Sequence, residues 1–130
     1  MTDFPTVSER VTQESIDAYA KISGDFNPLH VDPVAAAASE FGGTIAHGPI
    51  ALHPFFRAAT EWLGTDALPA GSEVKVTYRA PTRPGDELTV RLGELGTAED
   101  GRTELAAECV TQAGTAVVSI TALLPAPAAG

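Results

Sequence analysis

The chain has 130 residues, which is enough for one ordinary domain and too few for two. Hydrophobic residues make up 44% and charged residues 19%, a composition that favours a folded globular protein and argues against extended disorder. The formal net charge is -9, and the eight lysines and arginines form no basic stripe, so nucleic acid is not an expected partner.

The cysteine content and the hydropathy pattern limit the compartment. Cys109 is the sole cysteine, so no internal disulfide can form, and the reducing cytoplasm is the expected location. Residues 1–10 show no basic and apolar signal pattern, and no apolar run reaches 18 residues. Neither export nor a membrane partner is therefore expected.

The first predicted elements are a short strand and a helix. Residues 4–11 are predicted to form the strand. Thr12 follows as a residue type that caps helices, and the next apolar residues recur at helical spacing as far as Gly24. A helix is therefore predicted to begin after Thr12 and to end near Gly24.

A longer helix is predicted to begin near Pro49, because proline is favoured at the first helical position. Its apolar residues recur at spacings of three and four, which predicts one buried face. That face is formed by Leu52, Phe55, Phe56, Ala59, Trp62 and Leu63. Pro54 lies inside this helix, where proline removes a backbone hydrogen bond and costs about 3 kcal/mol. A kink or a delayed helix start is expected.

The second half of the chain alternates apolar and polar residues with a period of two, which predicts strands. The predicted strands are 73–79, 88–95, 103–111 and 115–124. A long helix followed by four consecutive strands predicts an α+β fold, in which an antiparallel sheet wraps around the helix. We expect one domain over residues 1–124 and a disordered tail over residues 125–130.

Asp25 and His30 are the pair of residues that suggests chemistry. Each one alone is more often structural than functional. The two lie five residues apart across a turn that Pro28 stiffens, because proline excludes the α conformation from Asn27. A carboxylate and an imidazole held in this way can converge on one small volume and polarise a water molecule.

Three segments carry a family resemblance. Residues 19–32, with the Gly-Asp-Phe-Asn-Pro-Leu-His block, resemble the signature of the (R)-specific enoyl-CoA hydratases, which belong to the MaoC-like hot-dog family. Residues 45–48 and 79–86 resemble further segments of that family, and the likeness extends from about residue 12 to residue 124. It implies that Asp25 and His30 are a catalytic dyad, which positions water for addition to a trans-2-enoyl thioester or receives it in the reverse reaction.

The same resemblance implies that Gly48 is the oxyanion donor. Water addition at the β-carbon places enolate charge on the thioester oxygen, and a backbone N–H at a helix N-terminus is oriented to stabilise it. Gly48 has an alternative interpretation, since a glycine before a helix also relieves a tight turn. Ser23 and Asn27 are predicted to brace the dyad turn, and His47 to support the site structurally.

The acyl pocket is where the sequence departs from the family pattern. Its candidate residues are Leu52, His53, Phe56 and Ala59. Phe56 stands where related hydratases have a smaller residue, which predicts a shortened or redirected pocket, whereas a kink at Pro54 would open a wider side pocket. His53 is either an additional site group or a partly exposed helix residue, and the second interpretation is preferred.

The predicted function is a hydratase or dehydratase of fatty-acid, polyhydroxyalkanoate or polyketide metabolism. No metal or cofactor is expected, and coenzyme A or phosphopantetheine enters only as part of the substrate. A symmetric homodimer that pairs sheet edges is expected, with a heterodimer as the alternative. Two other functions stay open: a hot-dog thioesterase, whose sequences usually lack the Gly-Asp-x-Asn-Pro-x-His block, and a non-catalytic partner subunit of a heterodimeric dehydratase. The acyl chain, the carrier and the direction of the reaction also stay open.

Overall fold

The computed structural model describes residues 4–125, so nearly all of the predicted disordered tail lies outside the described residues. In chain order the elements are β1 (Ser8–Arg10), α1 (Gln13–Ser23), α2 (Pro28–Val31), α3 (Pro33–Ala37), α4 (Gly48–Leu63), β2 (Glu73–Tyr78), β3 (Glu87–Thr97), β4 (Thr103–Val110) and β5 (Ala116–Leu124). In residues 4–125, no helix has the length and apolar character that a membrane span needs.

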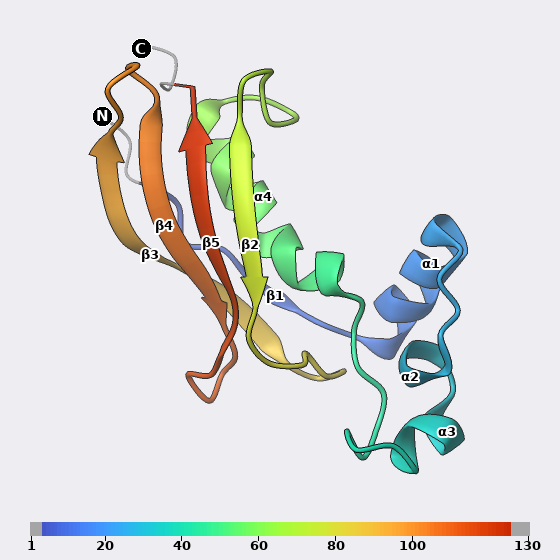
Figure 1. Cartoon of the computed structure of the whole chain (residues 1–130). Helices are drawn as coiled ribbons and strands as arrows, with labels where there is room; N and C mark the ends of the chain where they lie inside the picture. The colour runs from blue at the N-terminus through green and yellow to red at the C-terminus, as the bar shows by residue number, and fades with distance from the viewer. Residues whose placement is uncertain (1–3, 126–130) are drawn as a thin grey trace.

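The five strands form one antiparallel sheet in the order β1-β3-β4-β5-β2. The three central strands are consecutive in the chain, and the short strand β1 and the strand β2 form the two edges. Helix α4 lies along one face of the sheet and contacts β3, β4 and β5 (Figure 1). The predicted α+β fold, with an antiparallel sheet around a long helix, is confirmed.

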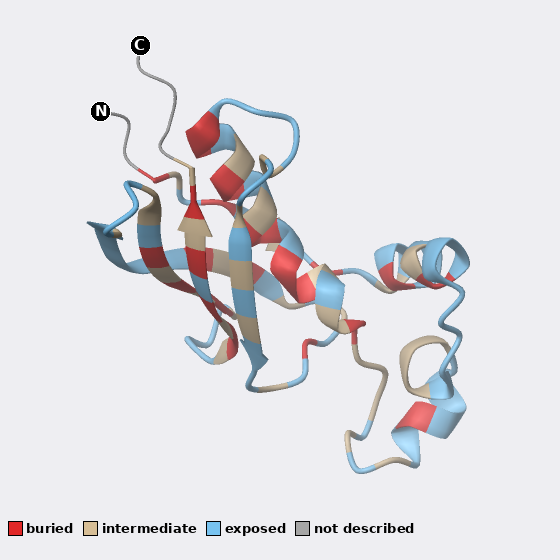
Figure 2. Ribbon diagram, turned by 45° about the horizontal axis from the view of Figure 1, so that its top comes forward, coloured by how far each residue is buried: buried red, intermediate tan, exposed pale blue. Residues whose placement is uncertain are grey.

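The hydrophobic core lies between α4 and the sheet, where buried residues of both elements face one another (Figure 2). Phe55 on α4 is fully buried and stacks on Phe4 with ring centroids 6.2 Å apart. Burial of one such aromatic ring contributes about 1.5 to 3 kcal/mol. Cys109 is buried in the same core, and burial raises the pKa of its thiol to about 11, so this thiol stays protonated and unreactive.

Pro54 does not delay the start of α4. The helix begins at Gly48 and continues through Pro54 to Leu63, so the expectation of a delayed start is wrong. Pro49 occupies the first turn, where no intrahelical donor is needed. Pro54 itself is buried, and contacts of its ring in the core offset part of the cost of the lost backbone bond. A bend at Pro54 stays a prediction.

Helices α1, α2 and α3 form a separate group to one side of the sheet and α4 (Figures 1 and 2). The predicted start and end of α1 are confirmed. Thr12 and Ser15 form a reciprocal capping box at its start, and Gly24 ends it in the left-handed conformation at φ 78°. The turn predicted between Asp25 and His30 leads into the short helix α2, because Pro28 fits the first position of a helix.

Candidate active site

The turn between α1 and α2 holds Asp25 through a series of side-chain hydrogen bonds. The Ser23 hydroxyl accepts the Asp25 N–H at 3.2 Å, and Asp25 Oδ1 accepts the Asn27 N–H at 3.2 Å. Asn27 Oδ1 in turn accepts the N–H of Leu29 at 3.0 Å and caps α2. Ser23 and Asn27 therefore lie where they brace the turn between Asp25 and His30.

A second brace comes from Gln13 at the start of α1, a residue that sequence reasoning missed. Its amide Nε2 donates to the carbonyl oxygen of His30 at 2.9 Å, and its Oε1 accepts the Thr44 hydroxyl at 2.7 Å. One side chain thus ties α1, α2 and the segment before α4 together. No local pattern marks Gln13, because its partners lie 17 and 31 positions away in the sequence.

The hydrogen bonds of His30 fix which ring nitrogen is free. Nδ1 lies 2.9 Å from the carbonyl oxygen of Ile45. A carbonyl only accepts, so Nδ1 carries the proton in the neutral ring, and the lone pair of Nε2 is left free. Nε2 lies 3.9 Å from Asp25 Oδ2. That separation is too long for a direct hydrogen bond and suits one water bonded to both atoms.

His47 contacts both residues of this pair. Its ring is buried and stacks on the His30 ring, with centroids 3.9 Å apart and an angle of 25° between the planes. The Tyr19 ring covers it from another side at 4.8 Å. His47 Nε2 donates to the Asp25 carbonyl oxygen at 2.9 Å, while Nδ1 is buried without a hydrogen-bond partner in residues 4–125. These contacts position His30 and the Asp25 backbone.

Asp25, His30 and His47 are also the one group of described residues whose potential metal ligands lie close together, within 4.8 Å. The two rings are stacked, so their nitrogen lone pairs lie in two nearly parallel planes and cannot both point at one ion. Each ring also uses one nitrogen for a backbone carbonyl. The geometry therefore favours water over a metal ion at this place.

Gly48 begins α4 beside His30, and the ring of Tyr78 lies against it. A Cβ at position 48 would stand 2.7 Å from Tyr78 Cζ and 2.8 Å from its hydroxyl oxygen, closer than such atoms approach. Gly48 is absent from the glycines with positive φ, so it does not relieve a strained turn. The tight-turn interpretation is therefore not supported, and the oxyanion role of Gly48 stays a prediction. Tyr78, at the end of β2, was predicted only as a strand residue.

A cavity of about 420 Å³ adjoins the dyad. His30, His47, Gly48 and Tyr78 are among the residues that line it. The rest of the wall is mainly apolar and comes from the segment before α4 and the segment after β2. This volume lies within the range of small-molecule sites. His30 and the N-terminus of α4 at Gly48 thus share one cavity, whereas Asp25 is not among its lining residues.

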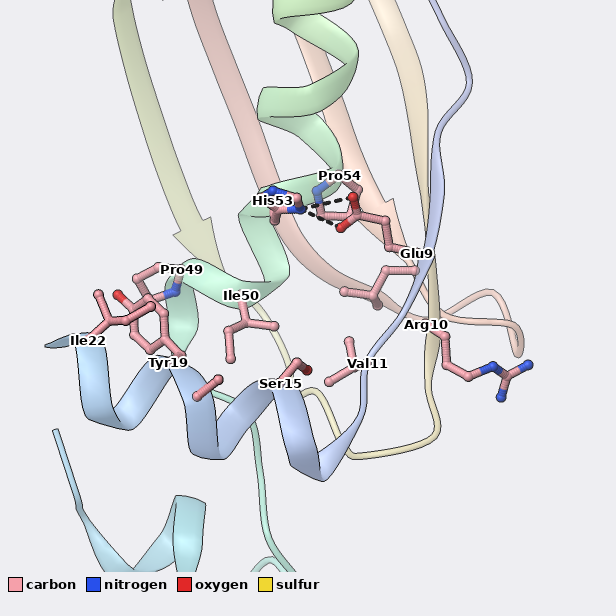
Figure 3. Close-up of a pocket in the computed structure, with 12 residues that line it drawn as sticks. Glu9, Arg10, Val11, Ser15, Tyr19, Ile22, Pro49, Ile50, His53 and Pro54 are labelled. Carbon is pink, nitrogen blue, oxygen red and sulfur yellow. Dashed lines mark hydrogen bonds and ion pairs between the residues drawn. The ribbon is translucent and has the colours of Figure 1, made fainter. Parts of the chain in front are cut away.

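A second pocket of about 350 Å³ lies between α1 and α4 (Figure 3). Tyr19 and Ile22 of α1 face Pro49 and Ile50 of α4 across it, so its walls are largely apolar. At its rim, the dashed lines of Figure 3 join His53 to the carboxylate of Glu9. Pro49 lines this pocket and its neighbour Gly48 lines the cavity at His30, so both hollows lie beside the first turn of α4.

The four acyl-pocket candidates lie on different faces of α4. Leu52 and Ala59 are buried in the core towards the sheet, whereas Phe56 and His53 line a third hollow of about 420 Å³ on the outer face. His53 is bound to Glu9, with its side chain 66% exposed. None of the four is among the described residues that line the cavity at the dyad. Their role at the acyl chain stays a prediction.

The sequence of this chain is similar to those of known proteins over most of its length. Residues 3–116 match the family model of the MaoC like domain. The (R)-specific enoyl-CoA hydratase of Aeromonas caviae is 30% identical over 123 residues, which cover 93% of this chain and 90% of that protein. Peroxisomal multifunctional enzyme type 2 of Drosophila melanogaster is 34% identical over 108 residues, or 83% of this chain.

The lengths of these relatives differ. The chain spans only 17% of the Drosophila protein, and 22% of a probable dehydratase from Ajellomyces capsulatus. Among solved structures, the unliganded R-hydratase of Pseudomonas aeruginosa has a TM-score of 0.81 at 27% identity, covering 96% of this chain and 80% of that one. The (R)-hydratase structure from A. caviae has a TM-score of 0.78 at 28% identity, covering 94% and 93%.

Proposed function

Because the chain belongs to the MaoC-like dehydratase family, we propose that it is a hydro-lyase acting on acyl thioesters. It adds water to trans-2-enoyl thioesters in the (R) sense, or removes water from (3R)-hydroxyacyl thioesters. The observation that carries the proposal is the 3.9 Å separation between His30 Nε2 and Asp25 Oδ2, with Nδ1 of His30 committed to the Ile45 carbonyl. The A. caviae relative, matched over 90% of its length, supports the substrate class and the stereochemistry.

Water activation follows from the positions of the two side chains. His30 Nε2 has a free lone pair and accepts one proton of the water, while the Asp25 carboxylate accepts a hydrogen bond from the other. The water oxygen then bonds to the β-carbon. The carboxylate stabilises the imidazolium that forms, and His30 returns its proton to the α-carbon. One water is consumed, and one C–O and one C–H bond replace the double bond.

The negative charge that develops during this step needs a partner. As the oxygen adds to the β-carbon, electron density moves to the thioester oxygen. The N–H of Gly48 has no partner within α4, because it lies in the first turn of that helix, and it is favourably oriented for this oxygen. Loss of one such donor typically costs about 100-fold to 1,000-fold in kcat.

The proposed partners follow from the same chemistry. The substrate is a thioester of coenzyme A or of an acyl carrier protein, and proton transfer between water, His30 and carbon requires no redox cofactor or metal. Strand β2 is an edge of the sheet and ends at the cavity beside the dyad, so pairing of two β2 edges would complete the site in a homodimer. The buried, protonated thiol of Cys109 fits a reducing compartment such as the cytoplasm.

The test is an absorbance assay with crotonyl-CoA and a longer trans-2-enoyl-CoA, run beside a free-thiol assay. Loss of the enoyl chromophore without thiol release is the expected result for a hydratase. Thiol release would instead indicate a thioesterase. Absence of both reactions, in the isolated chain and with each candidate carrier, would indicate a partner subunit and overturn the proposal.

A further inference from the structure

We propose that the hydroxyl group of Tyr78 is a second hydrogen-bond donor to the thioester oxygen, next to the N–H of Gly48. This inference rests on the proposed hydratase function and names a further catalytic residue for it. The oxygen that gains charge in the reaction would then be held between one backbone donor from α4 and one side-chain donor from the end of β2.

The position of the Tyr78 hydroxyl is the first support. Its oxygen lies 2.8 Å from the place where a Cβ on Gly48 would stand, so it adjoins the backbone of the proposed oxyanion donor. Tyr78 and Gly48 line the same cavity, together with His30. A thioester oxygen that accepts a hydrogen bond from the Gly48 N–H would therefore lie close to this hydroxyl.

The hydroxyl is also available as a donor. In residues 4–125 the structure shows no hydrogen bond from it, and the side chain is 53% exposed rather than packed into the core. Burial of the phenol by its neighbours, and then the nearby Tyr19, raise the pKa of Tyr78 above its usual value. The group therefore keeps its proton at neutral pH, which a donor to a developing enolate requires.

A simple packing role would account for the ring but not for the hydroxyl. The ring covers Gly48, and phenylalanine would fill that space equally well. The hydroxyl adds a polar group at the wall of the cavity where negative charge develops. Replacement of tyrosine by phenylalanine therefore separates the two roles, because it keeps the ring and removes the donor.

The first experiment compares kcat and KM of the full chain, Tyr78→Phe and Tyr19→Phe on crotonyl-CoA. Tyr78→Phe is expected to lower kcat about 10-fold or more with little change in KM, because the donor acts mainly on the charged transition state. Tyr19→Phe is the comparison variant: it keeps the ring that stacks on His47 and removes only the hydroxyl of the chain's other tyrosine, which lies near Tyr78 but lines the pocket between α1 and α4. It should lower kcat far less.

The second experiment measures the hydrogen bond itself, by the infrared C=O stretch of crotonyl-CoA bound to Asp25→Asn, which holds the substrate without rapid turnover. Adding Tyr78→Phe should move that stretch to higher wavenumber, because the carbonyl loses one donor. Melting temperatures of the single variants should agree within a few degrees, which excludes general loss of structure.

The outcomes separate this inference from the proposed function. If the wild-type chain hydrates the substrate while Tyr78→Phe keeps its kcat and leaves the C=O stretch in place, Tyr78 only packs against Gly48 and the inference is wrong. If the wild-type chain hydrates no enoyl thioester, the proposed function has failed first. A lower kcat with an unchanged stretch would also overturn the donor role.

Discussion

The structure contains two histidine–carboxylate pairs, and they differ in the distance between the two side chains and in the exposure of the imidazole. In the dyad, His30 Nε2 and Asp25 Oδ2 are 3.9 Å apart, and the imidazole is only 14% exposed. In the second pair, His53 Nδ1 contacts Glu9 at 2.7 Å, and the imidazole is 66% exposed. The side chains of the first pair are not in direct contact, and the lone pair of His30 Nε2 stays free. The side chains of the second pair contact each other directly.

The surroundings enlarge this difference. Glu9 also accepts a hydrogen bond from Arg57 at 2.8 Å, so its charge is already compensated by a cation. In the described residues no lysine or arginine pairs with Asp25, and its one partner of this kind is His30. A carboxylate and an imidazole thus form a candidate active site when hydrogen bonds to the backbone hold them slightly apart. Without such bonds they form a direct ion pair at the surface.

The largest expected effect is on the dyad. Asp25→Asn and His30→Ala should each lower kcat about 100-fold or more, because each removes a group that takes part in proton transfer. Enoyl-CoA hydration assays measure this effect, and thermal melting should show little change. If either variant kept near wild-type turnover on a confirmed substrate, the catalytic role of this pair would be wrong, and the two pairs would no longer differ in function.

An effect on substrate choice is expected near the second pair, one turn along α4 from His53. If Phe56 lines the acyl channel, Phe56→Ser should raise the kcat/KM ratio of eight-carbon over four-carbon enoyl-CoA about 10-fold, equivalent to ~1.4 kcal/mol. The measurement is steady-state kinetics with both substrates. An unchanged ratio would mean that Phe56 serves only to pack against the core and that the acyl chain lies elsewhere.

A smaller effect is expected from the brace of the dyad. Gln13→Ala frees the carbonyl of His30 and the hydroxyl of Thr44, and should lower kcat about 3-fold to 10-fold, because small displacements of catalytic groups reduce the rate. Arg57→Ala is the matched control, since it removes the corresponding brace of Glu9. Equal losses in both variants would show that the two braces do not differ in function.

The smallest effect is expected for the second pair itself. His53→Ala should change kcat by less than about 3-fold and the free energy of unfolding by at most about 1 kcal/mol, as is usual for exposed ion pairs. Chemical denaturation at low and high salt measures the change in the free energy of unfolding, which should become smaller as salt is added. A loss of kcat comparable to that of His30→Ala would make His53 a site residue after all.

The sequence alone was sufficient for features that depend on neighbours a few positions away. The helix cap at Thr12, the end of α1 near Gly24 and the alternation of the later strands were predicted and observed. The turn that brings Asp25 near His30 is likewise held by hydrogen bonds between residues only two positions apart. Local conformational preferences act over this range, and sequence patterns record them.

The tertiary structure decided what depends on distant neighbours. The free nitrogen of His30 is set by a carbonyl 15 residues away, and the partner of His53 is a glutamate 44 residues away. Gly48 lies against the ring of Tyr78, which the sheet brings to it from 30 positions along the chain. No pattern around these residues indicates such partners, because they meet only when the elements of the fold pack together. That packing is driven by the burial of apolar surface from the whole chain.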